Sequence, residues 1–262
     1  MSREPRSPEI CKNELVVLVY SQRAKDADMD KMNSRLLAFR LIIYTVISLC
    51  IMVGLLFLPA GTFDWWRAWV LIGVIAAGSL ISELRLFPEH KDLIRERLKP
   101  PIQKGQPLAD KIITLLMMLL FCGMFVFIAL DVFRFHLMGR PGLFVSFAGL
   151  ALLVAGWRIA YVALRENAFA ALVVKSQGER GQTVIDSGVY GVVRHPMYAG
   201  AIPFFLGMPL WLESYAAVVL TVFLIFLLML RIMIEEKFLR RELTGYDAYT
   251  NRVRYRLIPH VW

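Results

Sequence analysis

The residue types best suited to binding chemistry gather in a short polar turn, residues 188–200, which lies between long apolar runs. The turn reads GVYGVVRHPMYAG and places Arg194, His195 and Tyr198 within five positions. Pro196 favours a helix start, because its missing N–H would be unpaired in a first turn anyway. Two interpretations stay open. These side chains either anchor the chain at a membrane surface or form one wall of a polar site.

A second polar stretch, RIMIEE, follows the last apolar run. Arg231 and Glu235 are four residues apart, so they share one face of a helix. Such a pair is either a salt bridge where the helix leaves the membrane or a functional pair that faces the protein interior. Further along the chain, Tyr246 and Tyr249 are three residues apart. They could line one side of a site or contact lipid headgroups.

The approach to the turn is rich in glycine, at positions 178, 181 and 188. Glycine permits tight backbone turns. Between these glycines the sequence Thr183-Val184-Ile185 favours an extended segment. The backbone N–H and C=O groups of such a segment could hydrogen-bond a polar ligand.

The composition indicates a membrane protein. Hydrophobic residues make up 58% of the 262 residues, and the mean hydropathy is +0.57, above the range of ordinary soluble domains. The net charge of +9 does not indicate nucleic-acid binding, because the basic residues flank apolar runs and form no basic stripe. The three Cys and four His residues are scattered, so we expect neither a disulfide framework nor a metal site.

Six apolar spans predict an all-α, multi-pass transmembrane helical bundle. We place them at residues 41–58, 65–81, 112–130, 143–164, 197–212 and 214–230. The last two nearly fuse, and together they are about twice the ~20 residues of one bilayer crossing. We therefore predict a tight hairpin of two antiparallel helices that breaks at Glu213-Ser214.

Basic residues set the predicted orientation. With the N-terminus in the cytosol, 26 of the 30 Lys and Arg residues fall in cytosolic segments, as the positive-inside rule requires. We therefore expect both termini and the 188–200 turn in the cytosol. Residues 1–40 are predicted to be a cytosolic tail, partly disordered, with Met29 and Met32 as alternative starts. Residues 41–262 form the membrane domain, and its loop 82–111 is expected to be solvated.

Order and spacing of these motifs resemble a known family. The pattern GVY-x-x-x-RHP-x-Y-x-G, followed by two short spans, R-x-x-x-EE and G-x-x-x-Y, resembles the isoprenylcysteine carboxyl methyltransferase family over residues 165–262. It is also similar to the related phospholipid N-methyltransferases. Residues 59–111 look like the bacterial branch of the family. Two positions depart from the pattern: Gln182 stands where the family often has His, and Lys175 where it has Gln.

The resemblance implies S-adenosylmethionine as the methyl donor, bound in a cytosolic pocket. It implies that Arg231 binds the carboxylate of the acceptor and that Glu235 acts in both catalysis and cofactor binding. No metal is implied. The remaining residues that the resemblance assigns to the cofactor are Gln182, Thr183, Val184, Ile185, Tyr190, His195, Pro196, Met197 and Tyr198.

The expected reaction is carboxyl O-methylation of a lipid-like, isoprenylcysteine-like acceptor, a prenylated small molecule or peptide. Phospholipid N-methylation is the alternative, in which a carboxylate such as Glu236 could accept the proton of an amine. A non-enzymatic membrane protein that keeps the fold, and a reductase of the wider superfamily, are alternatives of other classes. We expect contacts with membrane lipids, no nucleic-acid partner, and a location in a bacterial inner membrane rather than the endoplasmic reticulum.

Overall fold

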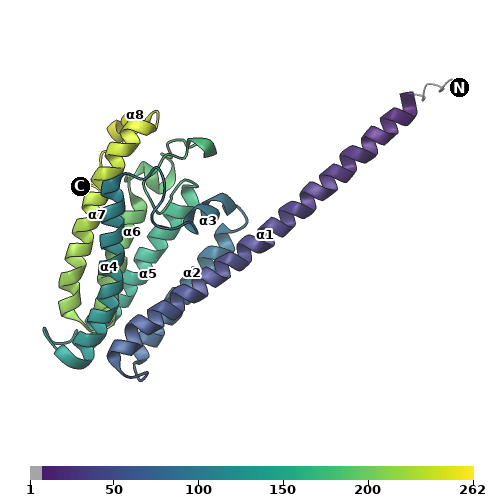
Figure 1. Cartoon of the computed structure of the whole chain (residues 1–262). Helices are drawn as coiled ribbons and strands as arrows, with labels where there is room; N and C mark the ends of the chain where they lie inside the picture. The colour runs from purple at the N-terminus through teal and green to yellow at the C-terminus, as the bar shows by residue number, and fades with distance from the viewer. Residues whose placement is uncertain (1–7) are drawn as a thin grey trace. The chain divides into compact units, whose positions relative to one another are not determined.

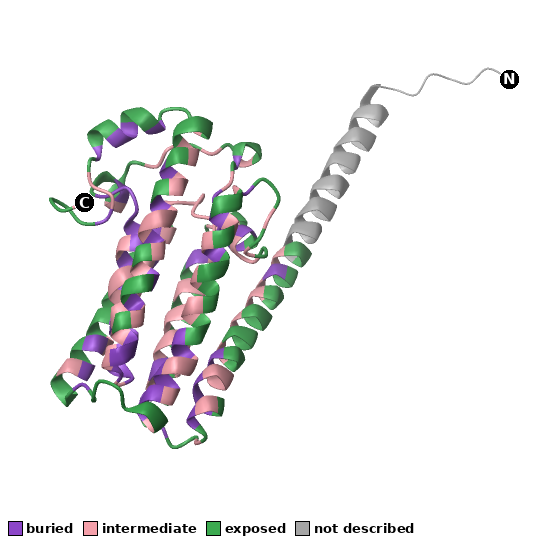
Figure 2. Cartoon of the chain, turned by 60° about the vertical axis from the view of Figure 1, so that its left-hand side comes forward, coloured by how far each residue is buried: buried purple, intermediate pink, exposed green. Residues whose placement is uncertain are grey.

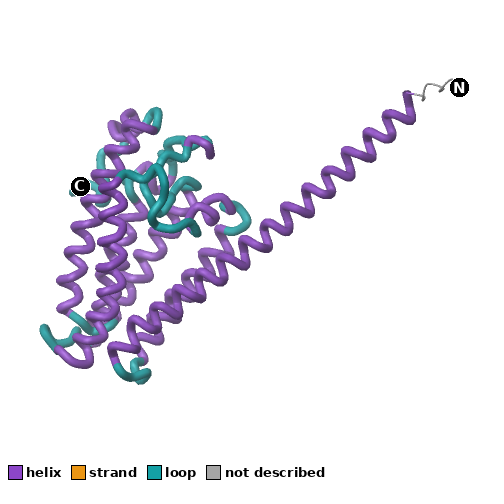
Figure 3. The backbone as a smooth tube through the Cα atoms, in the orientation of Figure 1, coloured by secondary structure: helices purple, strands orange, loops and turns teal. Residues whose placement is uncertain are grey.

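The computed structural model describes the backbone of residues 8–262, and the side chains from residue 32 onward. This part of the chain is built from helices and contains no strand (Figure 1, Figure 3). The chain divides after Tyr44 into two compact units. The second unit, Thr45–Trp262, holds the bundle and the candidate site.

The first helix, α1, covers Pro8–Ala60. Residues 1–7 of the expected tail lie outside the described part, but from Pro8 the chain is helical. The predicted domain boundary at residue 40 therefore falls inside a continuous helix, and the membrane-compatible portion of this helix, Met32–Ala60, begins before the predicted span. The charged residues before position 40 suggested a separate tail. Charged side chains on the surface of a helix do not end it, however, so the helix continues through them.

The expected multi-pass helical bundle is confirmed, with one correction to the number of spans. Among the described residues, five helices are long and apolar enough to cross a membrane, and the predicted fifth span is a helix of only 16 residues, α6. A crossing needs about 17–25 residues. The helices of the bundle after α1 are α2 (Trp66–Leu86), α4 (Leu108–Leu130), α5 (Leu143–Glu166), α6 (Pro196–Trp211) and α7 (Tyr215–Glu242).

Helices α5 and α6 pack antiparallel at very short range, because glycines face each other along the contact. A Cβ on Gly156 would lie 2.5 Å from the carbonyl oxygen of Gly200. One on Gly207 would lie 2.3 Å from the carbonyl oxygen of Gly149. In each helix the two glycines are seven positions apart, which keeps them on one face. This contact fixes the first turn of α6 beside the last turn of α5.

The predicted break at Glu213-Ser214 is confirmed. Glu213 adopts a left-handed conformation, with φ of 69°. Ser214 caps α7, accepting a hydrogen bond from the N–H of Ala217 at 3.0 Å. Its hydroxyl also donates to the buried carboxylate of Asp131 at 2.6 Å. These bonds satisfy polar groups that would otherwise be buried unpaired at the helix start.

Large apolar side chains cover the outer faces of the bundle. Phe144, Val222, Phe223 and Phe226 are exposed, and Figure 2 shows exposed stretches along the outer side of the long helices. Apolar surface on this scale is not tolerated in water, whereas lipid tails are as apolar as these side chains. Together with the length of the helices, it defines an integral membrane protein.

The longest loops and several short helices gather at one end of the bundle (Figure 3). They include α3 (Lys91–Arg97), α8 (Tyr246–Arg252) and two short 3-10 turns, Gly178–Arg180 and Gly188–Gly191. This end also contains most of the polar residues that the sequence singled out.

The segment around α3 differs from the solvated loop that the sequence suggested. Glu96 is buried and forms ion pairs with Lys99 and Lys175. Burial raises the pKa of the Glu96 carboxyl, but the two lysines outweigh it and hold that pKa below its usual value of 4.5. Arg97 donates to the carbonyl oxygen of Ala170 at 3.0 Å. The segment therefore braces the 167–177 loop.

Candidate functional site

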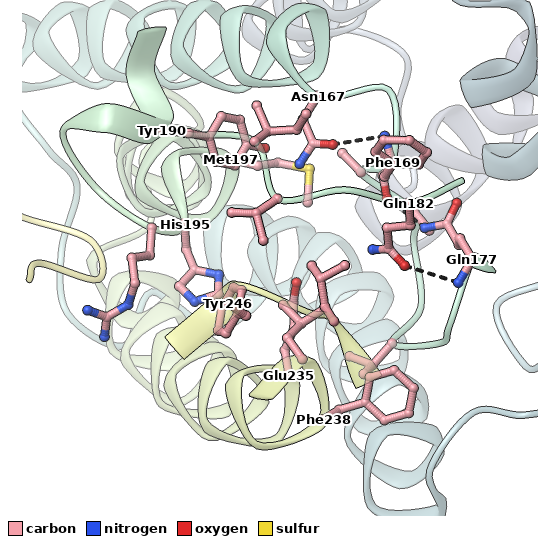
Figure 4. A pocket seen from close by; sticks show the side chains of 18 of the residues that line it. Asn167, Phe169, Gln177, Gln182, Tyr190, His195, Met197, Glu235, Phe238 and Tyr246 are labelled. Atoms are coloured by element: carbon pink, nitrogen blue, oxygen red, sulfur yellow. Dashed lines mark hydrogen bonds between the residues drawn. The ribbon is translucent and has the colours of Figure 1, made fainter. Parts of the chain in front are cut away.

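A cavity opens at the polar end of the bundle (Figure 4). Four parts of the chain line it: the loop from Asn167 to Ile185, the turn that leads into α6, the last turns of α7, and α8. The glycine contact between α5 and α6 positions the turn, and the hairpin at Glu213 brings the end of α7 back beside it. Residues from 167 to 249 thus meet around one space.

Most of the predicted cofactor residues line this cavity. They are Gln182, Thr183, Val184, Ile185, Tyr190, His195, Met197, Tyr198 and Glu235. Two predicted site residues are not part of the lining: Pro196, which is buried as the first residue of α6, and Arg231, the predicted acceptor-binding residue, which lies one helical turn before Glu235. The segment 182–185 belongs to no helix and no strand.

Glu235 presents a carboxylate to the cavity without a cationic partner. Its Oε2 accepts a hydrogen bond of 2.6 Å from the hydroxyl of Tyr198, and no basic side chain in the described part of the chain forms an ion pair with it. The ring of Tyr198 stacks on that of His195, with centroids 5.6 Å apart. The cavity lining thus holds a carboxylate that forms no ion pair, beside two aromatic rings, although Arg231 lies within electrostatic range of it. This arrangement favours a cationic ligand.

Arg231 is held by protein groups rather than by Glu235. Its Nε donates to Asp110 at 3.1 Å, and its Nη2 donates to the carbonyl oxygen of Leu172. Its guanidinium also lies 5.9 Å from the ring centre of Tyr198. Asp110 is fully buried and further accepts from the backbone N–H of Val174 at 3.0 Å. The expected i,i+4 salt bridge is therefore replaced by a pair between α7 and α4.

Glu236 is the centre of a buried ionic network. Its Oε1 accepts a hydrogen bond of 2.7 Å from Nε of Arg194 and lies 3.2 Å from Nε2 of His195. Its Oε2 accepts a hydrogen bond of 3.0 Å from Nε of Arg256. Arg194 also donates to the carbonyl oxygens of residues 253 and 254. These contacts tie the turn, α7 and the C-terminal segment together. Both oxygens of Glu236 are thus occupied by protein partners, which disfavours the role of proton acceptor considered from the sequence. Arg194 is an internal tether and not a surface anchor.

Tyr190 and Tyr249 line the side of the cavity near the turn. The hydroxyl of Tyr249 donates to the carbonyl oxygen of Tyr190 at 2.8 Å. Burial raises the pKa of the Tyr190 phenol to about 12, and the side chain of Asn167 opposes this shift. Both phenols remain protonated at neutral pH, because burial likewise raises the pKa of Tyr249. They act as neutral hydrogen-bonding groups.

Sequence reasoning missed several residues of the site. Asp110 gave no signal, because it lies at the start of an apolar helix 121 positions from its partner. Asn167 and Gln177 lie in a loop without a motif. Tyr246 and Tyr249 were considered for a site because of their spacing, and both line the cavity. In the described residues, no group of three or more His, Cys, Asp or Glu side chains could hold a metal ion.

The fold and the cavity define an integral membrane protein with a polar ligand site at one end of its helical bundle. Residues 144–244, which include α5, α6, the cavity loop and α7, match the family model described as phospholipid methyltransferase. This part of the chain is similar to the membrane phospholipid methyltransferases, and the match confirms the resemblance seen in the sequence. No curated protein matches the chain in a direct comparison.

Proposed function

We propose that the protein transfers a methyl group from S-adenosylmethionine to a lipid-like acceptor at the membrane surface. The observation that carries this proposal is the meeting of nine predicted cofactor residues, from three separate segments, around one cavity with an unpaired carboxylate, Glu235. The family match independently supports membrane methyl transfer.

The chemistry of the cavity fits this cofactor. S-adenosylmethionine carries an ammonium, a carboxylate, an adenine ring and a methyl group on a cationic sulfonium, which it supplies to the acceptor. Glu235 would bind the ammonium, since it has no other cation. The rings of Tyr198 and His195 would attract the sulfonium or stack on the base. The backbone groups of residues 182–185 would hydrogen-bond the remaining polar atoms.

We propose a carboxylate as the acceptor, oriented by Arg231. A carboxylate is ionised at pH 7 and needs no general base, so the protein has only to position its oxygen. Positioning of this kind can supply roughly 7–11 kcal/mol. The hydrogen bonds to Asp110 and to the carbonyl oxygen of Leu172 hold the guanidinium of Arg231 in one orientation. A fixed guanidinium favours a bidentate bond to the acceptor.

An amine acceptor is the second candidate, and two observations favour it. The matching family is named for phospholipids, and Asp110 already neutralises Arg231, which weakens the attraction for a second carboxylate. An amine must lose a proton, and Glu235, the carboxylate in the cavity lining, would accept it. In either case we propose that the cavity faces the cytosol, with both termini on that side, and that the natural setting is a bacterial inner membrane.

One experiment tests the reaction and separates the acceptors. Membranes that contain the protein are incubated with methyl-labelled S-adenosylmethionine, and the lipids are extracted. Label that is released by mild base indicates a methyl ester, whereas base-stable label in phospholipid headgroups indicates N-methylation. Calorimetry on the detergent-solubilised protein runs alongside. If it detects no binding of S-adenosylmethionine or S-adenosylhomocysteine, the proposal fails and a non-enzymatic role takes its place.

A further inference from the structure

The hydroxyl of Tyr246 is the one cavity-lining polar group whose burial the protein itself does not explain. Tyr246 is only 4% exposed, and its hydroxyl oxygen has no hydrogen-bond partner among the described residues. A buried hydroxyl without a partner is destabilising, and native proteins avoid it unless a ligand or function requires it. Figure 4 shows Tyr246 among the side chains that line the cavity, together with His195 and Glu235.

The position of Tyr246 is built into the fold. It is the first residue of α8, directly after Gly245, which adopts φ of 86°. A residue with a side chain would be strained there, so the glycine allows the sharp turn from α7 that brings Tyr246 over the cavity. Its ring packs with Tyr249, Val253 and the apolar part of the lining, including Val184 and Leu239. The ring is fixed by packing, and the hydroxyl alone is unused.

The charges around Tyr246 indicate which ligand group it meets. Burial is the main cause that raises the pKa of its phenol; the carboxylates of Glu236 and Glu235 add to this effect, and Arg194 opposes it. Glu236 forms ion pairs with Arg194 and Arg256, whereas Glu235 forms no ion pair among the described residues, so Glu235 is the carboxylate that a ligand can engage. The potential is therefore negative, and it favours a cationic donor over an anion. A phenol oxygen can accept a hydrogen bond from such a donor.

We infer that Tyr246 is a ligand-binding residue whose hydroxyl oxygen, together with the carboxylate of Glu235, binds the primary ammonium of the adenosyl amino-acid cofactor. The inference rests on the proposed function. It assigns to α8 a part in cofactor recognition and not only in closing the fold.

Ligands that lack one end of the cofactor test the assignment. S-adenosylhomocysteine, its decarboxylated analogue and its deaminated analogue are each titrated into the full-length protein in detergent, with wild type and Tyr246→Phe. Because one hydrogen bond to a charged group is lost, the variant should bind the first two ligands about tenfold more weakly. Its affinity for the deaminated analogue, which has no ammonium, should change by less than about twofold.

A matched control uses Tyr255, whose hydroxyl bonds His260 at the surface, 3.1 Å away, outside the cavity. Tyr255→Phe should leave the affinity for all three ligands unchanged. The ligand-free Tyr246→Phe protein should melt at or above the wild-type temperature, since no bond is lost. A lower melting temperature would show that the hydroxyl is bonded within the protein, and this would overturn the inference.

The remaining outcomes are equally decisive. Unchanged binding of S-adenosylhomocysteine by Tyr246→Phe overturns the inference while the proposed function stands. An equal loss for the deaminated analogue overturns the assignment to the ammonium. Absence of binding by the wild type overturns the proposed function itself.

Discussion

Two adjacent glutamates of α7 should respond in opposite ways to the same substitution. Glu236→Gln removes a charge and one acceptor oxygen from a buried network, and it leaves Arg194 with no anionic partner. Breaking a buried ion pair from one side costs about 3–5 kcal/mol. Glu235→Gln keeps an oxygen for the hydroxyl of Tyr198 and removes a charge that forms no ion pair among the described residues. Its cost to folding should be below about 1 kcal/mol.

Thermal melts and ligand titrations on the detergent-solubilised variants measure both effects. Glu236→Gln should lower the melting temperature by on the order of 10 °C. Glu235→Gln should melt close to wild type but bind S-adenosylhomocysteine roughly 10- to 100-fold more weakly, because a charge-assisted bond to the ammonium is lost. The two variants differ by one position, so each serves as the control for the other.

The reasoning is refuted if Glu236→Gln melts within about 2 °C of wild type, or if Glu235→Gln loses stability and keeps its affinity. The first result would mean that the network around Arg194 contributes nothing measurable. The second would return Glu235 to the role of a structural salt-bridge residue, as the sequence alone allowed.

Three further predictions concern packing, the acceptor and pH. Gly156→Ala should destabilise the bundle by about 1–3 kcal/mol, because its Cβ would stand 2.5 Å from a backbone carbonyl of α6; thermal melting measures this. Arg231→Ala should reduce methyl transfer at least tenfold while changing the affinity for S-adenosylhomocysteine by less than about threefold, because Arg231 orients the acceptor by charge-assisted bonds; since the substitution also leaves the buried Asp110 without its cation, both assays are run well below the lowered melting temperature of the variant. The lowered pKa of Glu96 means that its ion pairs stabilise the fold above pH 4.5 and are lost below it. The melting temperature of Glu96→Gln should therefore fall less than that of wild type as the pH drops below 4.5.

Each of these has a control or a contrary result. Gly123→Ala, at a helical glycine with nothing within 4 Å of the added carbon, should melt no lower than wild type; if it falls as far as the α5 variant, close packing is not the cause. Equal loss of ligand binding and methyl transfer in Arg231→Ala would indicate a folding defect. Parallel melting curves against pH for wild type and Glu96→Gln would show that its ion pairs contribute no stability.

Local features of the fold followed from the sequence because local physics decides them. Uncharged apolar runs predicted the long helices, and the excess length of the last run predicted the break at Glu213. The extension of α1 to Pro8 was not predicted. The mixed charges of this segment were interpreted as a tail, but charged residues by themselves do not end a helix. The shortness of α6 was also missed: its apolar run reads as a span, although it ends after 16 residues.

The sequence by itself determined which residues could form a site: the turn with His195 and Tyr198, and the face of α7 with Arg231 and Glu235. Only the tertiary structure decided their partners. Asp110 neutralises Arg231 because antiparallel packing brings the start of α4 beside the end of α7, leaving Glu235 unpaired in the cavity. Ion pairing depends on distances of a few ångströms between side chains far apart in sequence, and no local pattern records such distances.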